Sequence, residues 1–447
     1  MKKQLAVNLN NLLLSLSQVS DLANPLIAQH QHRVAFIALI VARNANLGPE
    51  IIENIFTAAL LHDIGAITVE EKIAVHNFEV VNENIHTIRG ELLLEQIPWL
   101  RKISKIVRNH HRHWNDWEQD IENTLVFSSQ IVLLADYVER LIDRNKYILH
   151  QSTDIVEIIK KLEGTVLDKK IVACFVDVSK RESFWLELTS SRLYSMLLDN
   201  APFNNMQIGL EDISLISNLY RDLIDFKSRF TATHTSGVSE CSVVLSQLYG
   251  FAEIDVKEMR IAGNFHDIGK LVMPNSILEK PGRLTVNEYA VMRCHTYNTF
   301  STLDSIGGLQ RIAEWAAYHH EKLDGSGYPF HLTNEEIGTG SRIMAVADIF
   351  TAISEDRPYR KGMNKDEIYK IFKTQTDEKL LDKRIVEVLL DNYETIKIQV
   401  KAKQLKALDF YEKRFLSIVE MRTIRNYENR FSIFRGDEFS EKGFNYR

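Results

Sequence analysis

The chain is poor in the residues that interrupt helices or cross-link a fold. Its 447 residues include 19 glycines and 8 prolines, both below average usage, which favours long helices over turn-rich sheets. The three cysteines, Cys174, Cys241 and Cys294, are widely spaced and form no CxxC pair. That spacing argues against a disulfide scaffold and fits a reducing compartment. Cys294 adjoins a histidine, but a site of histidines and aspartates needs no thiolate.

Long apolar runs and an excess of positive charge are also absent. No stretch approaches the roughly 18 apolar residues that a membrane span requires, and the N-terminal stretch has no apolar core of signal-peptide length. The formal net charge of −6 disfavours a protein that coats nucleic acid. We therefore expect a cytoplasmic protein without membrane insertion and without a nucleic-acid polymer as partner.

Helical patterning dominates what is present. Apolar residues recur at helical spacing over Ile51 to Leu61, and the stretch from Val256 to Phe265 repeats that pattern before a second His-Asp pair. Alternation typical of strands is scarce. The sequence predicts an all-α fold, and its length suffices for two or three domains with separate cores.

Ten of the fifteen histidines fall into two sets with the same order and spacing. Each set runs in the order His, His-Asp, His, His-His, Asp. In both sets the first histidine lies 32 positions before the His-Asp pair, and the third histidine lies 24 positions before the His-His pair. The first set is His30, His62, Asp63, His86, His110, His111 and Asp136; the second is His234, His266, Asp267, His295, His319, His320 and Asp348. Chance placement would scatter them, so the pattern indicates a duplicated metal-site scaffold.

The repeat extends beyond these residues, because 167–172 echo 381–386. We predict two tandem duplicated helical domains, 1–200 and 218–400, joined by a linker over 201–217 where Pro202 and nearby asparagines interrupt helix. Residues 401–447 are predicted to form a further helix and a tail. In the first set His32 competes with His30, and the alignment of Val34 with Val238 favours His30.

The residue types point to metal-assisted phosphate chemistry. Imidazole nitrogens suit divalent transition metals, and a carboxylate can bridge two of them. Five histidines and two aspartates are too many for one tetrahedral ion but suit two six-coordinate ions. Two metals about 4 Å apart clamp a phosphoryl group and lower the pKa of bound water. Single histidines such as His150 and His331 are better interpreted as ordinary hydrogen-bonding residues.

The second half resembles a known family. The stretch Asn264 to Lys270, followed by His319 to Pro329 with its Gly-Tyr-Pro loop, resembles the HD-GYP phosphodiesterases, a branch of the HD metal-dependent phosphohydrolases. Lys280 to Leu284 and Arg357 to Arg360 agree with the same family. The resemblance implies tandem HD-type domains, the first without the GYP loop. It also implies hydrolysis of a cyclic dinucleotide, cyclic di-GMP or 3',3'-cyclic GMP-AMP, to the linear dinucleotide in bacterial signalling.

The resemblance also implies roles for individual residues. One divalent metal would be held by His234, His266, Asp267 and Asp348, and a second by His295, His319, His320 and the bridging Asp267. Fe or Mn is expected, and Ni or others also fit. Asp267 and Lys270 are the implied catalytic residues, with Lys270 approaching the scissile phosphate. Tyr328, Thr351, Arg357 and Arg360 are the implied substrate contacts, the arginines as planar anchors for phosphate oxygens.

Two departures from the family bear on metal number and substrate. Phe230 stands where some members carry a glutamate for a third metal, so we expect two metals and a linear dinucleotide as product. Thr351 stands where guanine-reading members often have an aspartate. Because a hydroxyl both donates and accepts, Thr351 would discriminate guanine less strictly, which favours a mixed guanine–adenine substrate.

The first half keeps every metal-ligand position but lacks the remaining apparatus. Ala66 stands in place of Lys270, no Gly-Tyr-Pro loop follows His111, and 144–147 replace the arginine motif. Three interpretations stay open: a structural or regulatory domain that binds further metal, a second phosphohydrolase that removes the terminal phosphate of the linear product, or a metal-free dimer platform. Seven buried polar groups without metal would be costly, which favours metal retention.

Two alternatives to the phosphodiesterase remain. A non-catalytic cyclic-dinucleotide sensor would act through protein partners, but the retention of His266, Asp267 and Lys270 argues against it, since a binder needs no activated water. A general nucleotide phosphohydrolase would accept mononucleotides. Tandem helical domains often pair as homodimers, and the sequence leaves the oligomeric state, the regulatory input and the role of 401–447 open.

Overall fold

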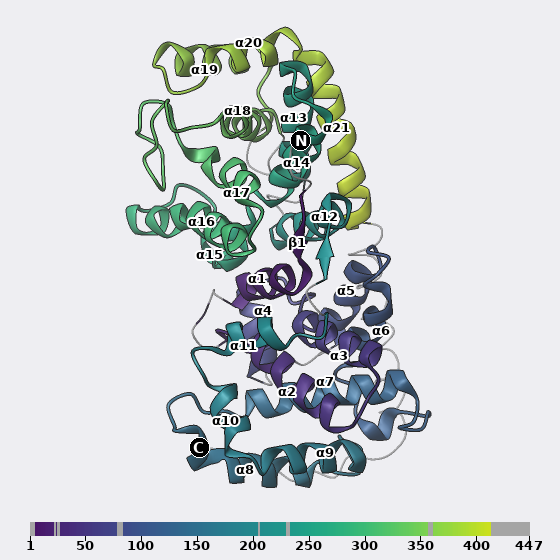
Figure 1. The fold of residues 1–447 in the computed structure, drawn as a ribbon. Helices are drawn as coiled ribbons and strands as arrows, with labels where there is room; N and C mark the ends of the chain where they lie inside the picture. The colour runs from purple at the N-terminus through teal and green to yellow at the C-terminus, as the bar shows by residue number, and fades with distance from the viewer. Residues whose placement is uncertain are drawn as a thin grey trace, which may run out of the picture.

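The protein folds as two helical lobes stacked end to end (Figure 1). This computed structural model describes residues 5–21, 24, 27–77, 84–203, 206–228, 233–355 and 361–412. Apart from one two-stranded sheet, the regular structure of those residues is helical, so the all-α prediction is confirmed. None of their helices is long and apolar enough to cross a membrane.

The first lobe consists of α2 (His30–Asn44), α3 (Pro49–Leu61), α4 (Val69–His76), α5 (Asn84–Leu94), α6 (Arg101–Asn109), η1 (Trp114–Asp116), α7 (Thr124–Arg140), α8 (Ile148–Lys161), α9 (Lys169–Ser179), α10 (Glu182–Leu188) and α11 (Leu193–Asn200). The second lobe consists of α12 (Leu210–Lys227), α13 (His234–Tyr249), α14 (Glu253–Phe265), η2 (Ile268–Val272), α15 (Asn275–Leu278), α16 (Val286–Ser305), α17 (Gln310–Ala317), η3 (Tyr318–His320), α18 (Thr339–Ser354), α19 (Lys365–Asp377), α20 (Lys383–Asp391) and α21 (Tyr393–Phe410).

The two lobes repeat one packing scheme around their histidines. In the first, α2 packs against α3 and α7; in the second, α13 packs against α14 and α18. Asp168 accepts from the first turn of α9, and Asp382 does the same for α20, which accounts for the echo between 167–172 and 381–386. The apolar faces of these helices form a core of fully buried aliphatic side chains.

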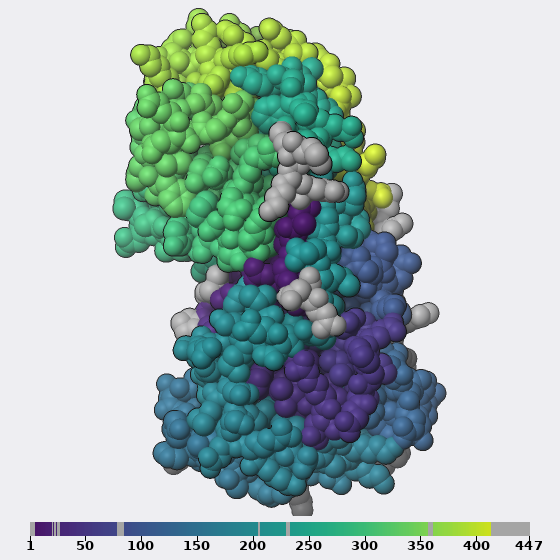
Figure 2. Space-filling model, in the orientation of Figure 1, coloured from purple at the N-terminus to yellow at the C-terminus, as the bar shows by residue number. Residues whose placement is uncertain are grey.

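The N-terminal helix α1 (Leu9–Asp21) ties the lobes together at their junction. It packs on α2 and α3 of the first lobe and also on α16 and η2 of the second. The Asn11 side chain donates to the carbonyls of Ser305 and Ile306 at 3.0 and 2.6 Å. Just before it, β1 (Val7–Asn8) pairs antiparallel with β2 (Gln207–Ile208). Figure 2 shows this dark purple segment between the two lobes.

Both first-histidine helices begin at a buried aspartate from the preceding segment. Asp21 accepts from the backbone N–H of Gln31 at 2.9 Å in α2. Asp225 accepts from the N–H groups of Thr235 and Ser236 in α13 at 2.9 and 3.2 Å. A carboxylate satisfies the free N–H groups of a first helical turn and interacts well with the helix dipole. These contacts hold the helix starts, and so the first histidines, in place.

Some predicted features lie outside the described residues. They are Phe230, Arg357, Arg360 and the tail from 413 onward.

The buried carboxylate beneath α13 generates a stability prediction. Replacing Asp225 by Ala leaves buried N–H groups of α13 without an acceptor, which we expect to lower the free energy of unfolding by about 1–2 kcal/mol. Urea denaturation followed by circular dichroism measures the change. Asp377→Ala, at an exposed aspartate of α19, is the control and should leave the midpoint unchanged. Equal midpoints for both variants would contradict the capping role.

Candidate metal centres

The structure brings all seven predicted metal-ligand residues of the second half into one buried centre. His234 opens α13, His266 caps the end of α14, and Asp267 follows it directly. His295 comes from α16, His319 and His320 from η3, and Asp348 from α18. Potential ligand atoms within 4.8 Å of one another form two groups, His234 with His266 and Asp348, and His295 with His319 and His320. This division is the same as that implied by the family resemblance.

Asp267 lies between the two groups. Its Oδ2 is 3.2 Å from Nε2 of His266, while its Oδ1 is 3.4 Å from Nε2 of His295 and 3.8 Å from that of His319. Each carboxylate oxygen therefore faces one group of imidazoles. A carboxylate in this position suits the bridge between two ions.

Three histidines of the second centre present Nε2 and not Nδ1 to the interior. The Nδ1 atoms of His266, His295 and His319 lie 2.9, 2.7 and 2.7 Å from the carbonyl oxygens three residues earlier. Because Nδ1 donates to these carbonyls, each Nε2 carries a lone pair. Two such Nε2 atoms, of His295 and His319, lie only 3.3 Å apart. Facing lone pairs repel unless a cation lies between them.

Other buried polar atoms of the second centre also lack a partner. Nε2 of His266 and Oδ1 of Asp267 have no hydrogen-bond partner among the described residues. Such groups are costly to bury unsatisfied. A donor set of imidazole nitrogens and carboxylate oxygens matches a divalent transition metal, so the residues fit the ion that the sequence predicts.

The charges of the second centre favour metal binding. Burial alone would raise the pKa of Asp267, but Lys270 and His266 hold it well below its usual range. Burial lowers the pKa of His295 to about 3, so this imidazole is neutral near pH 7. Burial opposes protonation of His234, yet Asp348 and Glu355 raise its pKa to about 9. Near pH 7, Asp267 and His295 therefore carry no proton that a metal must displace, whereas His234 does.

Lys270 projects toward the centre from η2. Its Nζ lies 2.5 Å from Oδ2 of Asp267, three residues earlier in the chain. The lysine side chain is mostly buried, which strengthens the electrostatic attraction to an incoming anion. The structure therefore places the predicted phosphate-binding cation against the predicted bridging carboxylate.

The Gly-Tyr-Pro loop folds back over η3. A Cβ on Gly327 would come within 2.4 Å of the backbone of Glu321, so only glycine fits there. The buried Glu321 accepts from the N–H groups of Phe330 and Leu332 at 2.7 and 3.0 Å. The Tyr328 ring then lies 5.0 Å from that of His320, beside the metal centre.

Thr351 is placed differently from what its predicted role requires. Its side chain is 0% exposed on α18, and its hydroxyl has no partner among the described residues. Its methyl group packs close to Gly237 of α13. A nucleobase has no open path to this hydroxyl, so base reading by Thr351 receives no support from its position.

The first half forms a second centre with the same layout. Asp63 again lies between two groups: its Oδ2 is 3.4 Å from Nε2 of His62, and its Oδ1 is 3.3 Å from Nε2 of His86. Potential ligand atoms of Asp63, His86, His110 and His111 lie within 4.8 Å of one another, as do those of His30, His62 and Asp63. Oδ1 of Asp63 and Oδ1 of Asp136 are buried without a partner. The residues of the first centre therefore also fit a metal.

His32, the competing first histidine, lies elsewhere. It is fully buried, and its Nε2 lies 3.0 Å from the carbonyl oxygen of Leu14. His30, in contrast, has its Nε2 3.2 Å from that of His62. The structure therefore brings His30 and not His32 into the first centre.

Two charged residues of the first centre stand at repeat positions that are uncharged in the second half. Arg140 donates to Oδ2 of Asp136 at 2.8 Å from one turn further along α7. Glu139 lies 2.5 Å from Nδ1 of His30 through Oε2 and accepts from Arg33 through Oε1. The positions equivalent to Glu139 and Arg140, three and four residues after the aspartate, are Thr351 and Ala352 in the second half. Glu139 and Arg140 therefore orient His30 and Asp136.

Sequence reasoning missed the carboxylates that orient the first histidines. Glu139 does so in the first centre, and Glu355 lies 3.6 Å from Nδ1 of His234 in the second. The two stand at different distances from their aspartates, three and seven residues, so the repeat itself gave no signal. The available signal was that a glutamate, Glu139, stands in the first half at the repeat position that Thr351 occupies in the second.

Comparisons with known proteins agree with this architecture. Family models described as HD domain match residues 27–141 and 218–385. The chain is 30% identical over 396 residues to 3'3'-cGAMP-specific phosphodiesterase 1 of Vibrio cholerae, covering 86% of this chain and 92% of the relative. It is 35% identical over 213 residues to a cyclic di-GMP phosphodiesterase of Thermotoga maritima, covering 47% of this chain and 54% of the relative.

A solved structure has the same fold. The crystal structure of a cyclic GMP-AMP specific phosphodiesterase of Vibrio cholerae, V-cGAP3, superposes with a TM-score of 0.60 at 20% identity. The superposition covers 90% of this chain and 98% of that one. At this identity the likeness bears on the fold alone.

A glycine two residues after each His-Asp pair permits the close packing of both centres. A Cβ on Gly269 would lie 1.9 Å from the carbonyl oxygen of His295, and one on Gly65 would lie 2.0 Å from that of His86. Gly269→Ala must therefore push η2 and α16 apart, at a cost of about 3 kcal/mol or more. We expect loss of the metal of the second centre, measured by elemental analysis, and a lower melting temperature.

Gly338→Ala is the matched control for this substitution. A Cβ on Gly338 meets nothing within 4 Å, and its φ of −66° suits alanine. Metal content and melting temperature should stay at the parent values. If Gly269→Ala also kept both values, the close contact between η2 and α16 would not be needed for the centre.

Proposed function

Because the chain belongs to the HD-GYP branch of the HD-domain phosphodiesterases and hydrolyses a cyclic dinucleotide, we propose that the second centre is its catalytic site. The observation that carries this proposal is the double role of Asp267. Its two oxygens face the two groups of imidazoles, and one of them also binds Lys270. A cation beside a predicted metal bridge is an arrangement for a phosphoryl group.

We propose that His234, His266, Asp267 and Asp348 hold one divalent metal and that His295, His319, His320 and Asp267 hold the second, with Fe or Mn preferred. When bound, the metals would supply Lewis-acid stabilisation of the phosphoryl oxygens and an acidified water. Lys270 would bind a phosphoryl oxygen and offset the negative charge that grows there. Tyr328 would line the substrate side of the centre, where its ring packs on that of His320. For Arg357 and Arg360, which lie outside the described residues, the proposed phosphate contacts rest on the family resemblance alone.

We propose 3',3'-cyclic GMP-AMP or cyclic di-GMP as the substrate and the linear dinucleotide as the product. The relatives carry both specificities in their names, and the one that matches over almost its full length is named for cyclic GMP-AMP. That relative makes the mixed dinucleotide the first substrate to test. The second centre has the seven residues of a two-metal site, and Phe230 stands where three-metal members of the family carry a glutamate. Two metals support cleavage of one phosphodiester bond only.

For the first centre we propose a bound metal as well, because Oδ1 of Asp63, like Oδ1 of Asp267, is buried without a partner. Removal of the terminal phosphate from the linear product is the second candidate activity, and the complete ligand set favours it over a metal-free platform. We propose domain boundaries at 1–200 and 218–400, which the two family matches support, although α12 of the second lobe already begins at Leu210, within the predicted linker 201–217. A cytoplasmic location is proposed from the three free cysteines, which suit a reducing compartment.

The catalytic proposal predicts the outcome of one substitution. Asp267→Ala removes the bridge and the contact of Lys270, so we expect the turnover of cyclic GMP-AMP to fall at least about a thousandfold, the scale of losing a principal electrostatic group. Chromatography and mass spectrometry of the products of cyclic GMP-AMP, cyclic di-GMP and cyclic di-AMP measure it. Asp377→Ala serves as the surface control.

Unchanged turnover in Asp267→Ala would contradict the assignment of the second centre. Equal hydrolysis of mononucleotides would favour the general phosphohydrolase instead.

A further inference from the structure

Helix α4 lies over the first metal centre. Thr68 and Glu71 form a capping box at its start. At its other end Arg140 donates to the carbonyls of Val75 and His76 at 2.6 and 3.1 Å, while the same guanidinium binds Asp136. The His76 ring lies 5.4 Å from that of His30. The C-terminal turn of α4 is therefore held against the centre itself.

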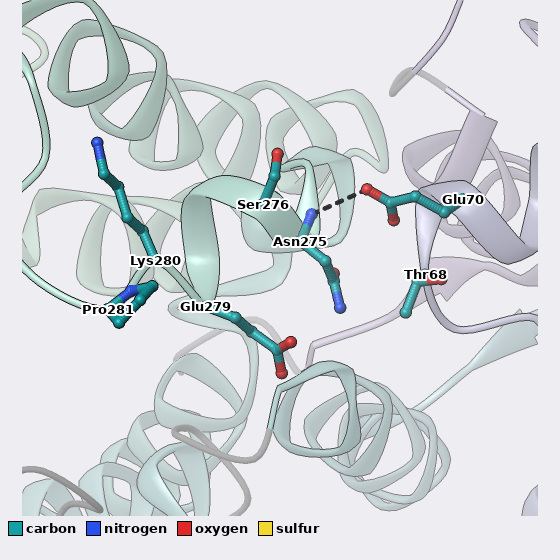
Figure 3. A pocket seen from close by; sticks show the side chains of 7 residues that line it. All are labelled: Thr68, Glu70, Asn275, Ser276, Glu279, Lys280 and Pro281. Atoms are coloured by element: carbon teal, nitrogen blue, oxygen red, sulfur yellow. Dashed lines mark hydrogen bonds between the residues drawn. The ribbon is translucent and has the colours of Figure 1, made fainter.

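The second domain holds the N-terminal turn of α4. The backbone N–H of Asn275 donates to Oε1 of Glu70 at 3.3 Å (Figure 3). Thr68 and Glu70 face Ser276, Glu279 and Lys280 across a pocket of about 510 Å³ between the domains. With both ends fixed, α4 has little freedom to turn its inner face away from the centre.

Lys72 occupies that inner face. It stands one helical turn before His76, so the two side chains leave α4 on the same side. Lys72 is 7% exposed, and the charges that act on its ammonium belong to Asp21, Asp63 and Glu71. Asp63 is part of the first centre, so this ammonium adds positive charge beside the centre. A mostly buried ammonium on the face of α4 that carries His76 is placed to bind an anion held there.

A second buried lysine interacts electrostatically with Lys72. Lys227, at the end of α12, is 3% exposed and donates to the carbonyl of Leu271 at 2.5 Å. Burial lowers its pKa to about 7; the charge of Lys72 acts in the same direction, and that of Glu70 acts against it. An anion bound nearby would favour the charged form of both lysines.

We propose that Lys72 is the phosphate-binding residue of the first centre and that this centre binds a ligand carrying a phosphate monoester or free phosphate. The proposal rests on the metal-binding role proposed for that centre. Lys72 then does from α4 what Lys270 does from η2 in the second domain. Ala66 occupies the repeat position that Lys270 occupies in the second half, so the first half has no lysine there. The compensating lysine comes nine residues after Asp63, from a helix whose counterpart α15 has only four residues.

The test uses full-length protein loaded with Mn in which Asp267→Ala and Lys270→Met are combined, so that both the proposed metal bridge and the proposed phosphate-binding cation of the second centre are removed. Inorganic phosphate is titrated by calorimetry, and melting temperature is followed with and without phosphate. A 5'-phosphorylated linear dinucleotide and the same dinucleotide without its terminal phosphate form two further arms. These arms separate a free-phosphate site from a site for a phosphorylated ligand.

Lys72→Met is the informative variant. We expect phosphate to bind at least about tenfold more weakly, the scale of one hydrogen bond to a charged group. Methionine also removes the buried charge, so the melting temperature without phosphate should stay level or rise. Lys161→Met, at an exposed lysine of α8, is the control and should retain the parent affinity. Manganese content is measured in each variant.

Three results would overturn the proposal. They are the absence of phosphate binding in the parent, equal phosphate affinity in Lys72→Met, and a loss of stability in Lys72→Met without phosphate, which would make Lys72 a structural residue. None of these results depends on cyclic-dinucleotide hydrolysis, because no cyclic dinucleotide is present in these titrations. Failure here and failure of the catalytic assignment are therefore distinguishable.

Discussion

The arrangement of both centres depends on one constraint: several imidazole lone pairs converge on a single buried carboxylate. Backbone carbonyls hold the Nδ1 side of His266 and His319, so their Nε2 atoms point inward. They approach both carboxylate oxygens of Asp267: Nε2 of His266 lies 3.2 Å from Oδ2, and Nε2 of His319 lies 3.8 Å from Oδ1. Neutral imidazoles and charged carboxylates in such proximity are stable only with cations among them. The glycine after each His-Asp pair, the helix starts on Asp21 and Asp225, and the crossing of α13 with α14 and α18 all serve this convergence.

The two copies share this constraint and differ in what surrounds it. In the second domain, Lys270 and Tyr328 border the centre and a loop shaped by Gly327 folds over it. In the first domain, Arg140 and Glu139 hold the ligands from behind, and α4 covers the centre with Lys72 on its inner face. The contacts of Asn11 with Ile306 and of Asn275 with Glu70 join the lobes. A duplicated scaffold has thus kept both clusters of histidines and aspartates while the residues around them changed.

The all-α fold and the clustering of the two histidine–aspartate sets could be predicted from the sequence, because helical patterning dominates and both sets recur in the same order and spacing. The contact between His30 and His62 agrees with the preference for His30 over His32. The sequence did not reveal Lys72, Glu139 or Glu355, because these residues reach the centres from unlike repeat positions or from another helix. Nor did it reveal that Thr351 is fully buried, since a repeat position specifies a helix face and not what packs on it. The docking of α1 on both lobes likewise depends on tertiary contacts without a local signal.

Anomalous X-ray diffraction from crystals grown with Mn would show whether a metal lies on each side of the Asp267 carboxylate. We expect two anomalous peaks about 4 Å apart, one toward His266 and one toward His295. We expect peaks beside Asp63 as well. An absence of peaks at Asp267 in a crystal that holds Mn elsewhere would mean that protons, and not metals, satisfy the converging imidazoles, and would rule out the proposed dimetal centre.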